Sequence, residues 1–173
     1  MTIPERLWQD IDRIPGWMTR TECDWLFESA AECDSWTEIG CWAGRSAVAT
    51  GMGLRKGALL QLVDPLSQPQ FWDSVQYLRS FRADLRIIVA ALTSEQAHTM
   101  LHDTAGVFVD AKHEYEHVKQ DIGLWGPKCR ILCGHDYGEP NPDLGTAEWG
   151  VKKAVDELLP GANRVAGAIW RRR

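Results

Sequence analysis

Acidic and imidazole side chains recur at two places in the second half of this chain. Asp110 ends one apolar run, and His113 comes shortly after it. His135 and Asp136 directly follow the next apolar run. If the two runs are neighbouring parallel strands, their carboxyl ends lie at one edge of a sheet, and we expect the four side chains to meet there.

Three roles stay open for this group of side chains. Asp110, His135 and Asp136 carry donors that could ligate a hard divalent cation such as Mg²⁺, with water in the remaining positions. Such an ion would hold and acidify a substrate hydroxyl. Without a metal, His113 or His135 would be a general base near neutral pH. In the third interpretation the groups only cap helices and bind loop backbone.

A glycine turn lies in the first third of the chain, in the segment Glu38-Ile-Gly-Cys-Trp-Ala-Gly-Arg-Ser46. Gly40 permits a sharp turn after an apolar run, and Gly44 lets the backbone approach a ligand closely. The free N–H groups of the helix expected next favour a carboxylate or a phosphate. The spacing matches neither the GxGxxG fingerprint nor a P-loop.

Asp64 ends the apolar run that follows this turn. In a nucleotide-binding βαβ unit, an acid at that point hydrogen-bonds the ribose hydroxyls. The glycine turn and the acid together predict a ribose-bearing cofactor. The structural alternative is a helix cap at Asp64 and ordinary turn glycines.

The elements that must position these residues follow from an alternation of apolar runs and helix-like segments. Short apolar runs predict the strands Trp36–Gly40, Ala58–Asp64, Arg86–Ala90, Gly106–Asp110 and Arg130–Gly134. The stretches between them predict the helices Ser46–Leu54, Pro69–Phe81, Ser94–Leu101 and His113–Trp125. This alternation is typical of βαβ units and a mainly parallel sheet.

The two ends of the chain differ from this alternation. Residues 1–34 form a helical preface, with a helix over Glu5–Arg13 and a second one capped by Thr19, where Glu22 completes a capping-box pattern. After a loop over Gly138–Glu148, expected to cover the cleft, a helix reaches Leu159. Arg164–Ala166 and Ala168–Arg171 then predict an antiparallel hairpin. The whole, residues 1–173, is expected to be one domain.

Composition narrows the class of protein. Apolar residues make up 45 % and the net charge is −5, which disfavours disorder and a broad nucleic-acid-binding face. Neither a membrane-spanning run nor a signal-peptide pattern occurs. The five cysteines form no CxxC pair, so we expect reduced thiols in a cytoplasmic protein. The nine tryptophans indicate core and interface packing and leave a homodimer open.

With these residues in view, the chain resembles the class I S-adenosylmethionine-dependent methyltransferases. Glu38–Ser46 is similar to their first motif. Val107–Asp121, Cys133–Tyr137 and Gly150–Glu157 are similar to a small bacterial subfamily related to the macrolide-sugar and cephalosporin-pathway O-methyltransferases. The resemblance runs from about residue 17 to residue 170.

The resemblance implies a Rossmann-like three-layer α/β sandwich whose mostly parallel seven-stranded sheet has an antiparallel last strand. It also implies Mg²⁺ held by Asp110 with His135 and Asp136, and His113 as the catalytic base. Ser94 would approach the adenine. The residues implied to bind S-adenosylmethionine are Glu38, Gly40, Cys41, Trp42, Gly44, Ser46, Asp64, Ser94 and Asp110.

The leading hypothesis is therefore methyl transfer from S-adenosylmethionine to a hydroxyl of a small-molecule acceptor. The alternative is a cofactor-binding or partner protein of this fold without methyl-transfer activity of its own. A nicotinamide-dependent oxidoreductase is disfavoured by the spacing of the glycine turn.

Overall fold

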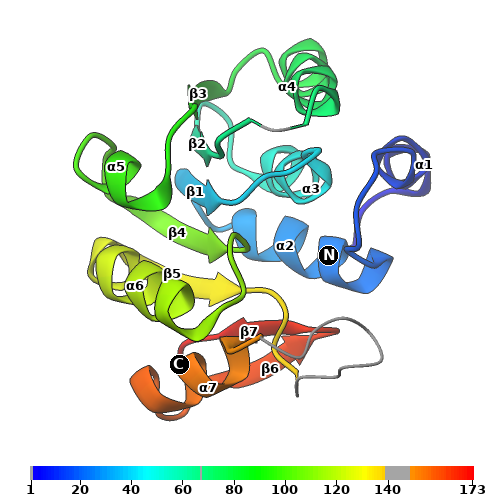
Figure 1. Ribbon diagram of the computed structural model, residues 1–173. Coiled ribbons are helices and arrows are strands. Elements are labelled where there is room, and N and C mark those ends of the chain that lie inside the picture. Colours follow the sequence, from blue (N-terminus) through cyan, green and yellow to red (C-terminus); the bar gives the residue numbers. More distant parts are fainter. Residues whose placement is uncertain (1, 67, 139–148) are drawn as a thin grey trace.

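Seven strands form one sheet in the computed structural model, which describes residues 2–66, 68–138 and 149–173 (Figure 1). Their order across the sheet is β3-β2-β1-β4-β5-β7-β6. The strands are β1 (Ser35–Ile39), β2 (Leu59–Val63), β3 (Arg86–Ala90), β4 (Thr104–Val109), β5 (Cys129–Gly134), β6 (Asn163–Ala166) and β7 (Ile169–Arg171).

The strand pairing confirms the predicted sheet. β1 lies between β2 and β4, and all pairs from β3 to β5 are parallel. β7 runs antiparallel to both β5 and β6. The chain crosses over between β3 and β4, so β1 and β4 are neighbours at the point where the strand order reverses. Ligands bind at such a switch point, outside the carboxyl ends of the strands.

The helices cover both faces of the sheet and make a three-layer α/β sandwich (Figure 1). Buried side chains of the first four helices pack on one face, and those of the last three on the other. They are α1 (Glu5–Asp12), α2 (Arg20–Ala30), α3 (Arg45–Gly53), α4 (Gln70–Phe81), α5 (Ser94–His98), α6 (Tyr115–Trp125) and α7 (Val151–Leu158), with a 3₁₀ turn, η1 (Gly126–Lys128).

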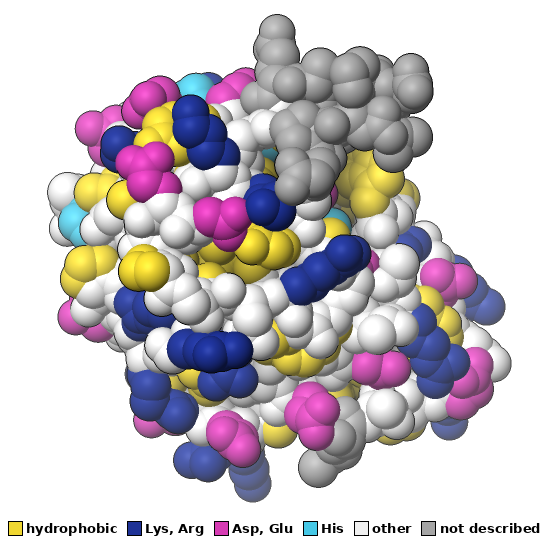
Figure 2. Space-filling view, turned by 90° about the horizontal axis from the view of Figure 1, so that it is seen from below, with side chains coloured by type: hydrophobic (Ala, Val, Ile, Leu, Met, Phe, Trp, Pro, Cys, Tyr) yellow, Lys and Arg dark blue, Asp and Glu magenta, His cyan; other side chains and the backbone are white. Residues whose placement is uncertain are grey.

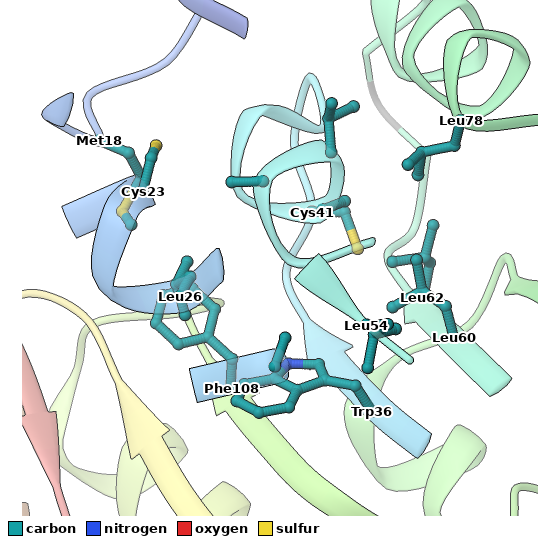
Figure 3. Packing of buried hydrophobic residues seen from close by; sticks show 14 of the residues in the cluster. Met18, Cys23, Leu26, Trp36, Cys41, Leu54, Leu60, Leu62, Leu78 and Phe108 are labelled. Carbon is teal, nitrogen blue, oxygen red and sulfur yellow. The ribbon is translucent and has the colours of Figure 1, made fainter. Parts of the chain in front are cut away.

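Alternation along β4 shows how one strand serves both cores. Phe108 joins the core under α1–α4, whereas Val107 and Val109 join the core under α5–α7. Trp36 on β1 is fully buried in the first core, near Phe108 (Figure 3). Its register partner on β4 is Gly106, where a Cβ would lie 2.2 Å from the indole ring. The absent side chain at Gly106 is therefore what makes room for the tryptophan.

Helix ends differ from the predicted bounds by up to three residues, and α5 ends at His98 and not at the predicted Leu101. The capping box of Thr19 and Glu22 is present as predicted. α6 begins at Tyr115 and not at His113, because Glu114 has an extended backbone and is the N-cap. His113 therefore lies in the loop after β4. Most of the predicted loop over Gly138–Glu148 lies outside the described residues.

The distribution of surface charge and the lengths of the helices can be compared with the sequence. On the face seen in Figure 2, acidic and basic side chains are interspersed, in keeping with the modest net charge of −5. Among the described residues, every helix is too short or too polar to cross a membrane.

Candidate active site

Two cavities open at the carboxyl ends of the parallel strands. One of about 510 Å³ has residues 15–18 of the N-terminal preface in its wall, and we call it the preface cavity. The other, of about 420 Å³, is lined by the first residues of α5, and we call it the α5 cavity. The two cavities are adjacent, because both are lined by Gly40, Trp42, Asp110 and Ala111.

The loop after β1 depends on a glycine at its first position. Gly40 has φ +85°, in the region that side chains disfavour. A Cβ there would lie 2.2 Å from the backbone oxygen of Asp110. The Asp110 N–H in turn donates to the backbone oxygen of Ile39 at 2.8 Å, so β1 and β4 are hydrogen-bonded at the point where the loop begins. Gly44, the N-cap of α3, also has a left-handed backbone, with φ +92°.

Glu38 binds the end of this loop from the protein interior. Its side chain is fully buried, and its Oε1 accepts a 2.7 Å hydrogen bond from the Ser46 hydroxyl. Among the described residues, its Oε2 has no hydrogen-bond partner. Burial raises the pKa of Glu38 to about 8, despite the bond from Ser46. Glu38 lines neither cavity, whereas Ser46 lines the preface cavity.

Asp64 binds the backbone of the same loop from the side of the α5 cavity. Its Oδ2 accepts the N–H groups of Cys41 and Trp42, both at 2.9 Å, and its Oδ1 accepts that of Leu66 at 2.6 Å. The residue is 7 % exposed and lines the α5 cavity. The sequence predicts a ribose contact for Asp64, and the structure adds a second role, because the carboxylate fixes the loop backbone. Oδ2 already accepts two hydrogen bonds, whereas Oδ1 accepts one and keeps a lone-pair site for a further donor.

Ser94 lies in the α5 cavity with its hydroxyl already engaged. It donates a short hydrogen bond to Asp121 and accepts one from the Trp125 indole at 2.9 Å. Asp121 is 5 % exposed, and burial raises the pKa of its carboxyl. Asp121 is not among the predicted site residues. The available signal was its position one residue before the buried Ile122 and three after the buried Val118, on the inward face of α6.

The structure brings the four predicted acidic and imidazole side chains together. The Asp136 carboxylate lies between two rings, with Oδ2 2.9 Å from His113 Nε2 and Oδ1 3.1 Å from His135 Nδ1. Asp110 Oδ1 is 3.9 Å from the same His135 nitrogen. The other nitrogen of His135 faces Glu22 of α2 at 3.1 Å.

Burial and mutual contact set the charges in this cluster. Burial, with Asp136 nearby, raises the pKa of Asp110 to about 7. Burial would raise the pKa of Asp136 too, but bonds from both histidines hold it well below its usual range. Burial would lower the pKa of His135, yet its bonds to Asp136 and Glu22 raise it to about 10. The pKa of His113 is also raised, since its bond to Asp136 outweighs burial.

Stability should therefore fall in alkaline solution. The folded-state pKa of His135 is above the usual 6.5, so its contribution is complete below 6.5 and is lost as the pH rises towards about 10. The loss in unfolding free energy is expected to be on the order of a few kcal/mol. Urea titrations across this range measure it. His135→Gln should show a flatter pH dependence, and an equally steep one would contradict the assignment.

The N-terminal preface contributes a wall that the sequence did not predict. The Arg45 guanidinium donates to the backbone oxygens of Ile14, Met18 and Asp12 at 2.7–2.9 Å, which holds the α1–α2 connection against the start of α3. Trp17 in this connection is 78 % exposed, and its ring centroid is 4.6 Å from that of Trp42. The tryptophans were predicted to pack in the core or at interfaces.

On the opposite side of the preface cavity, Trp149 stacks on His113 with ring centroids 4.3 Å apart. The two aromatic contacts are thus built by residues from four separate segments of the chain. Contacts of this kind leave no local pattern in the sequence, which is why tryptophan spacing alone selected none of them.

Solved structures share this fold at low sequence identity. An SAH-bound methyltransferase from Podospora anserina has a TM-score of 0.69 and 17 % identity, covering 99 % of this chain and 88 % of its own. A methyltransferase from Geobacter sulfurreducens has a TM-score of 0.72 and 10 % identity, covering 98 % and 88 %.

A third similar structure is an O-methyltransferase from Streptomyces achromogenes, involved in tomaymycin synthesis and in complex with SAM. Its TM-score is 0.66 and its identity 13 %, covering 96 % of this chain and 85 % of its own. No curated protein sequence matches the chain. The family model described as a methyltransferase domain matches residues 37–137, from β1 through both halves of the acidic and imidazole cluster. The chain therefore belongs to the methyltransferase domain family.

Proposed function

We propose that this protein transfers a methyl group from S-adenosylmethionine to a hydroxyl of a small molecule. The observation that carries the proposal is that two adjacent cavities share Gly40, Trp42 and Asp110. A cofactor with a nucleoside at one end and an amino acid at the other needs two adjacent compartments. Membership of the family supports methyl transfer, and the O-methyltransferases among the similar structures support oxygen as the acceptor atom.

The cofactor's adenosine suits the α5 cavity. Asp64 Oδ1 keeps one lone-pair site for a ribose hydroxyl, and the Asp121 carboxylate can accept from the adenine amine. The Ser94 hydroxyl is engaged, so Ser94 would contribute mainly shape. The methionine part suits the loop from Gly40 to Ser46, where the N-terminus of α3 favours a carboxylate.

In the transfer, the acceptor oxygen attacks the methyl carbon while the bond from that carbon to sulfur breaks. The sulfonium leaves as a neutral thioether, and the acceptor's proton must pass to a base. His113 lines the preface cavity and is oriented by Asp136 at Nε2 and by Trp149 on its face. With Nε2–H donated to Asp136, Nδ1, which has no hydrogen-bond partner among the described residues, would accept the proton.

We also propose that the cluster can hold a divalent cation such as Mg²⁺. Asp110, His113 and Asp136 each offer one ligand atom, all within 4.8 Å of one another, and two of the three are hard oxygens. A cation would favour the ionised form of Asp110, whose pKa burial raises to about 7. His135, expected from the resemblance to be a ligand, has both nitrogens facing carboxylates, so His113 takes its place in the proposed set.

The two arrangements use His113 differently. A bound cation would itself hold and acidify the acceptor hydroxyl, and His113 would then be a ligand. Without a cation, His113 is the base. Turnover that survives complete chelation would support His113 as the base, and loss that added Mg²⁺ restores would support the metal.

Isothermal titration with S-adenosylmethionine tests the proposed function directly. We expect one site with micromolar affinity, competition by S-adenosylhomocysteine, and no heat with NADH. Absence of binding at millimolar cofactor would overturn the proposal.

A further inference from the structure

Glu22 does more than its place in the sequence requires. As the third residue of α2 it completes a capping box, and its Oε2 accepts the backbone N–H and the hydroxyl of Thr19, both at 2.7 Å. This uses one carboxylate oxygen only. The residue is nevertheless 3 % exposed, a burial that helix capping does not need.

The second oxygen of Glu22 contacts the far end of the chain. Oε1 accepts the N–H of Ala168, in the β6–β7 turn, at 2.6 Å. The preceding Gly167 has φ +48°, and a Cβ there would lie 2.2 Å from that same oxygen. The hairpin turn therefore closes directly over the carboxylate and excludes water from it.

The same Oε1 also faces His135 Nε2 at 3.1 Å. His135 Nδ1 faces Asp136, so both ring nitrogens have carboxylate partners. The ring of His135 is therefore held at both nitrogens by carboxylate oxygens. The orientation of the His135 ring is fixed from two sides, by Glu22 of α2 and by Asp136.

His135 in turn orients the site. Asp136 Oδ1 is bound to His135, which turns Oδ2 towards His113 at 2.9 Å. The side chains thus form one continuous series from α2 to the preface cavity, Glu22–His135–Asp136–His113. Each contact joins an imidazole nitrogen to a carboxylate oxygen, and a hydrogen bond to an ionised group is short and strong.

We propose that Glu22 is a positioning residue of the methyl-transfer site, setting the orientation of His135 and, through Asp136, that of His113. This inference rests on the proposed function for the reaction that the series serves, but the coupling itself is a property of the free protein. Glu22 lines neither cavity, so its effect on cofactor binding should be absent.

The test is long-range ¹H–¹⁵N spectroscopy of the full chain with labelled histidines, without any ligand. The five histidine rings are assigned by single substitutions. In Glu22→Gln we expect loss or displacement of the His135 Nε2–H signal and a shift of the His113 ring signals. Thr19→Ala is the matched control, because it removes a contact of the other Glu22 oxygen, so it should lower the Tm and leave both rings unchanged.

Two outcomes would overturn the inference. One is a Glu22→Gln variant with a lower Tm and unmoved His113 signals, and the other is an equal shift in Thr19→Ala. If Glu22→Gln does not fold, Glu22→Asp keeps the charge but withdraws it from His135, and it is read in the same way. Titration of the same samples with S-adenosylmethionine separates the two proposals. Wild-type protein that fails to bind the cofactor contradicts the proposed function. The coupling between the rings is still decided by the histidine signals alone.

Discussion

Gly40→Ala is expected to destabilise the protein by at least about 2 kcal/mol and to abolish binding of S-adenosylmethionine. A left-handed residue with a Cβ costs about 1–2 kcal/mol, and Gly40 has φ +85°. The new Cβ would also lie 2.2 Å from the backbone oxygen of Asp110, which can yield only if the end of β4 moves. Such overpacking lowers the free energy of unfolding by a further ~1–3 kcal/mol. Urea unfolding and isothermal titration measure both effects.

Gly57→Ala separates backbone strain from the crowding at the site. Gly57 also has a left-handed backbone, with φ +75°, but a Cβ there would meet nothing within 4 Å. We expect this control to lose about 1–2 kcal/mol and to bind the cofactor as the wild type does. Equal losses in the two variants, with cofactor binding intact in both, would contradict the role given to the loop.

Asp136→Asn is expected to lower methyl transfer by about 100-fold or more, the usual scale for losing acid–base assistance. The backbone should be kept, because Asp136 has φ +59° and asparagine tolerates that region well. The amide replaces one acceptor oxygen by a donor, so one of the two histidines loses its partner. Affinity for Mn²⁺, used as a spectroscopic probe of the proposed cation site, should fall as well.

Asp103→Asn is the matched control for this substitution. Asp103 has a side chain that is 74 % exposed, in an ion pair with Lys128 and away from both cavities. Surface pairs of this kind contribute little, so activity and Mn²⁺ affinity should equal those of the wild type. Wild-type Mn²⁺ affinity in Asp136→Asn would contradict the proposed cation ligands.

The sheet could be predicted because its inner strands are short apolar runs that are largely buried. Arg86–Ala90 has the predicted bounds, and the other parallel strands differ by a residue or two at their ends. The closing hairpin was visible as two apolar pairs around a glycine. The capping box at Thr19 was visible because both of its members lie within one turn of helix.

The part of the site that could not be predicted depends on contacts between distant segments. Local sequence shows Glu22 as a cap, and nothing near it indicates that its other oxygen meets His135. Asp64 was expected to face a ribose or to cap a helix, and its bonds to the loop were not foreseen, because the loop N–H groups lie near it only once β1 and β2 pair. Trp17 is likewise positioned by a distant residue, because Arg45 hydrogen-bonds the backbone of the α1–α2 connection on both sides of it.

The contact between Glu22 and Ala168 also bears on how the protein is made. The two residues are 146 positions apart, and Glu22 is buried only when the β6–β7 hairpin covers it. During synthesis, α2 and the first strands leave the ribosome long before residue 168 exists. Until then a carboxylate destined for the interior stays in water, and β5 presents an open edge to other chains. We therefore expect the addition of β7 to be a late, long-range step of folding, and the interval before it to be the one most exposed to aggregation.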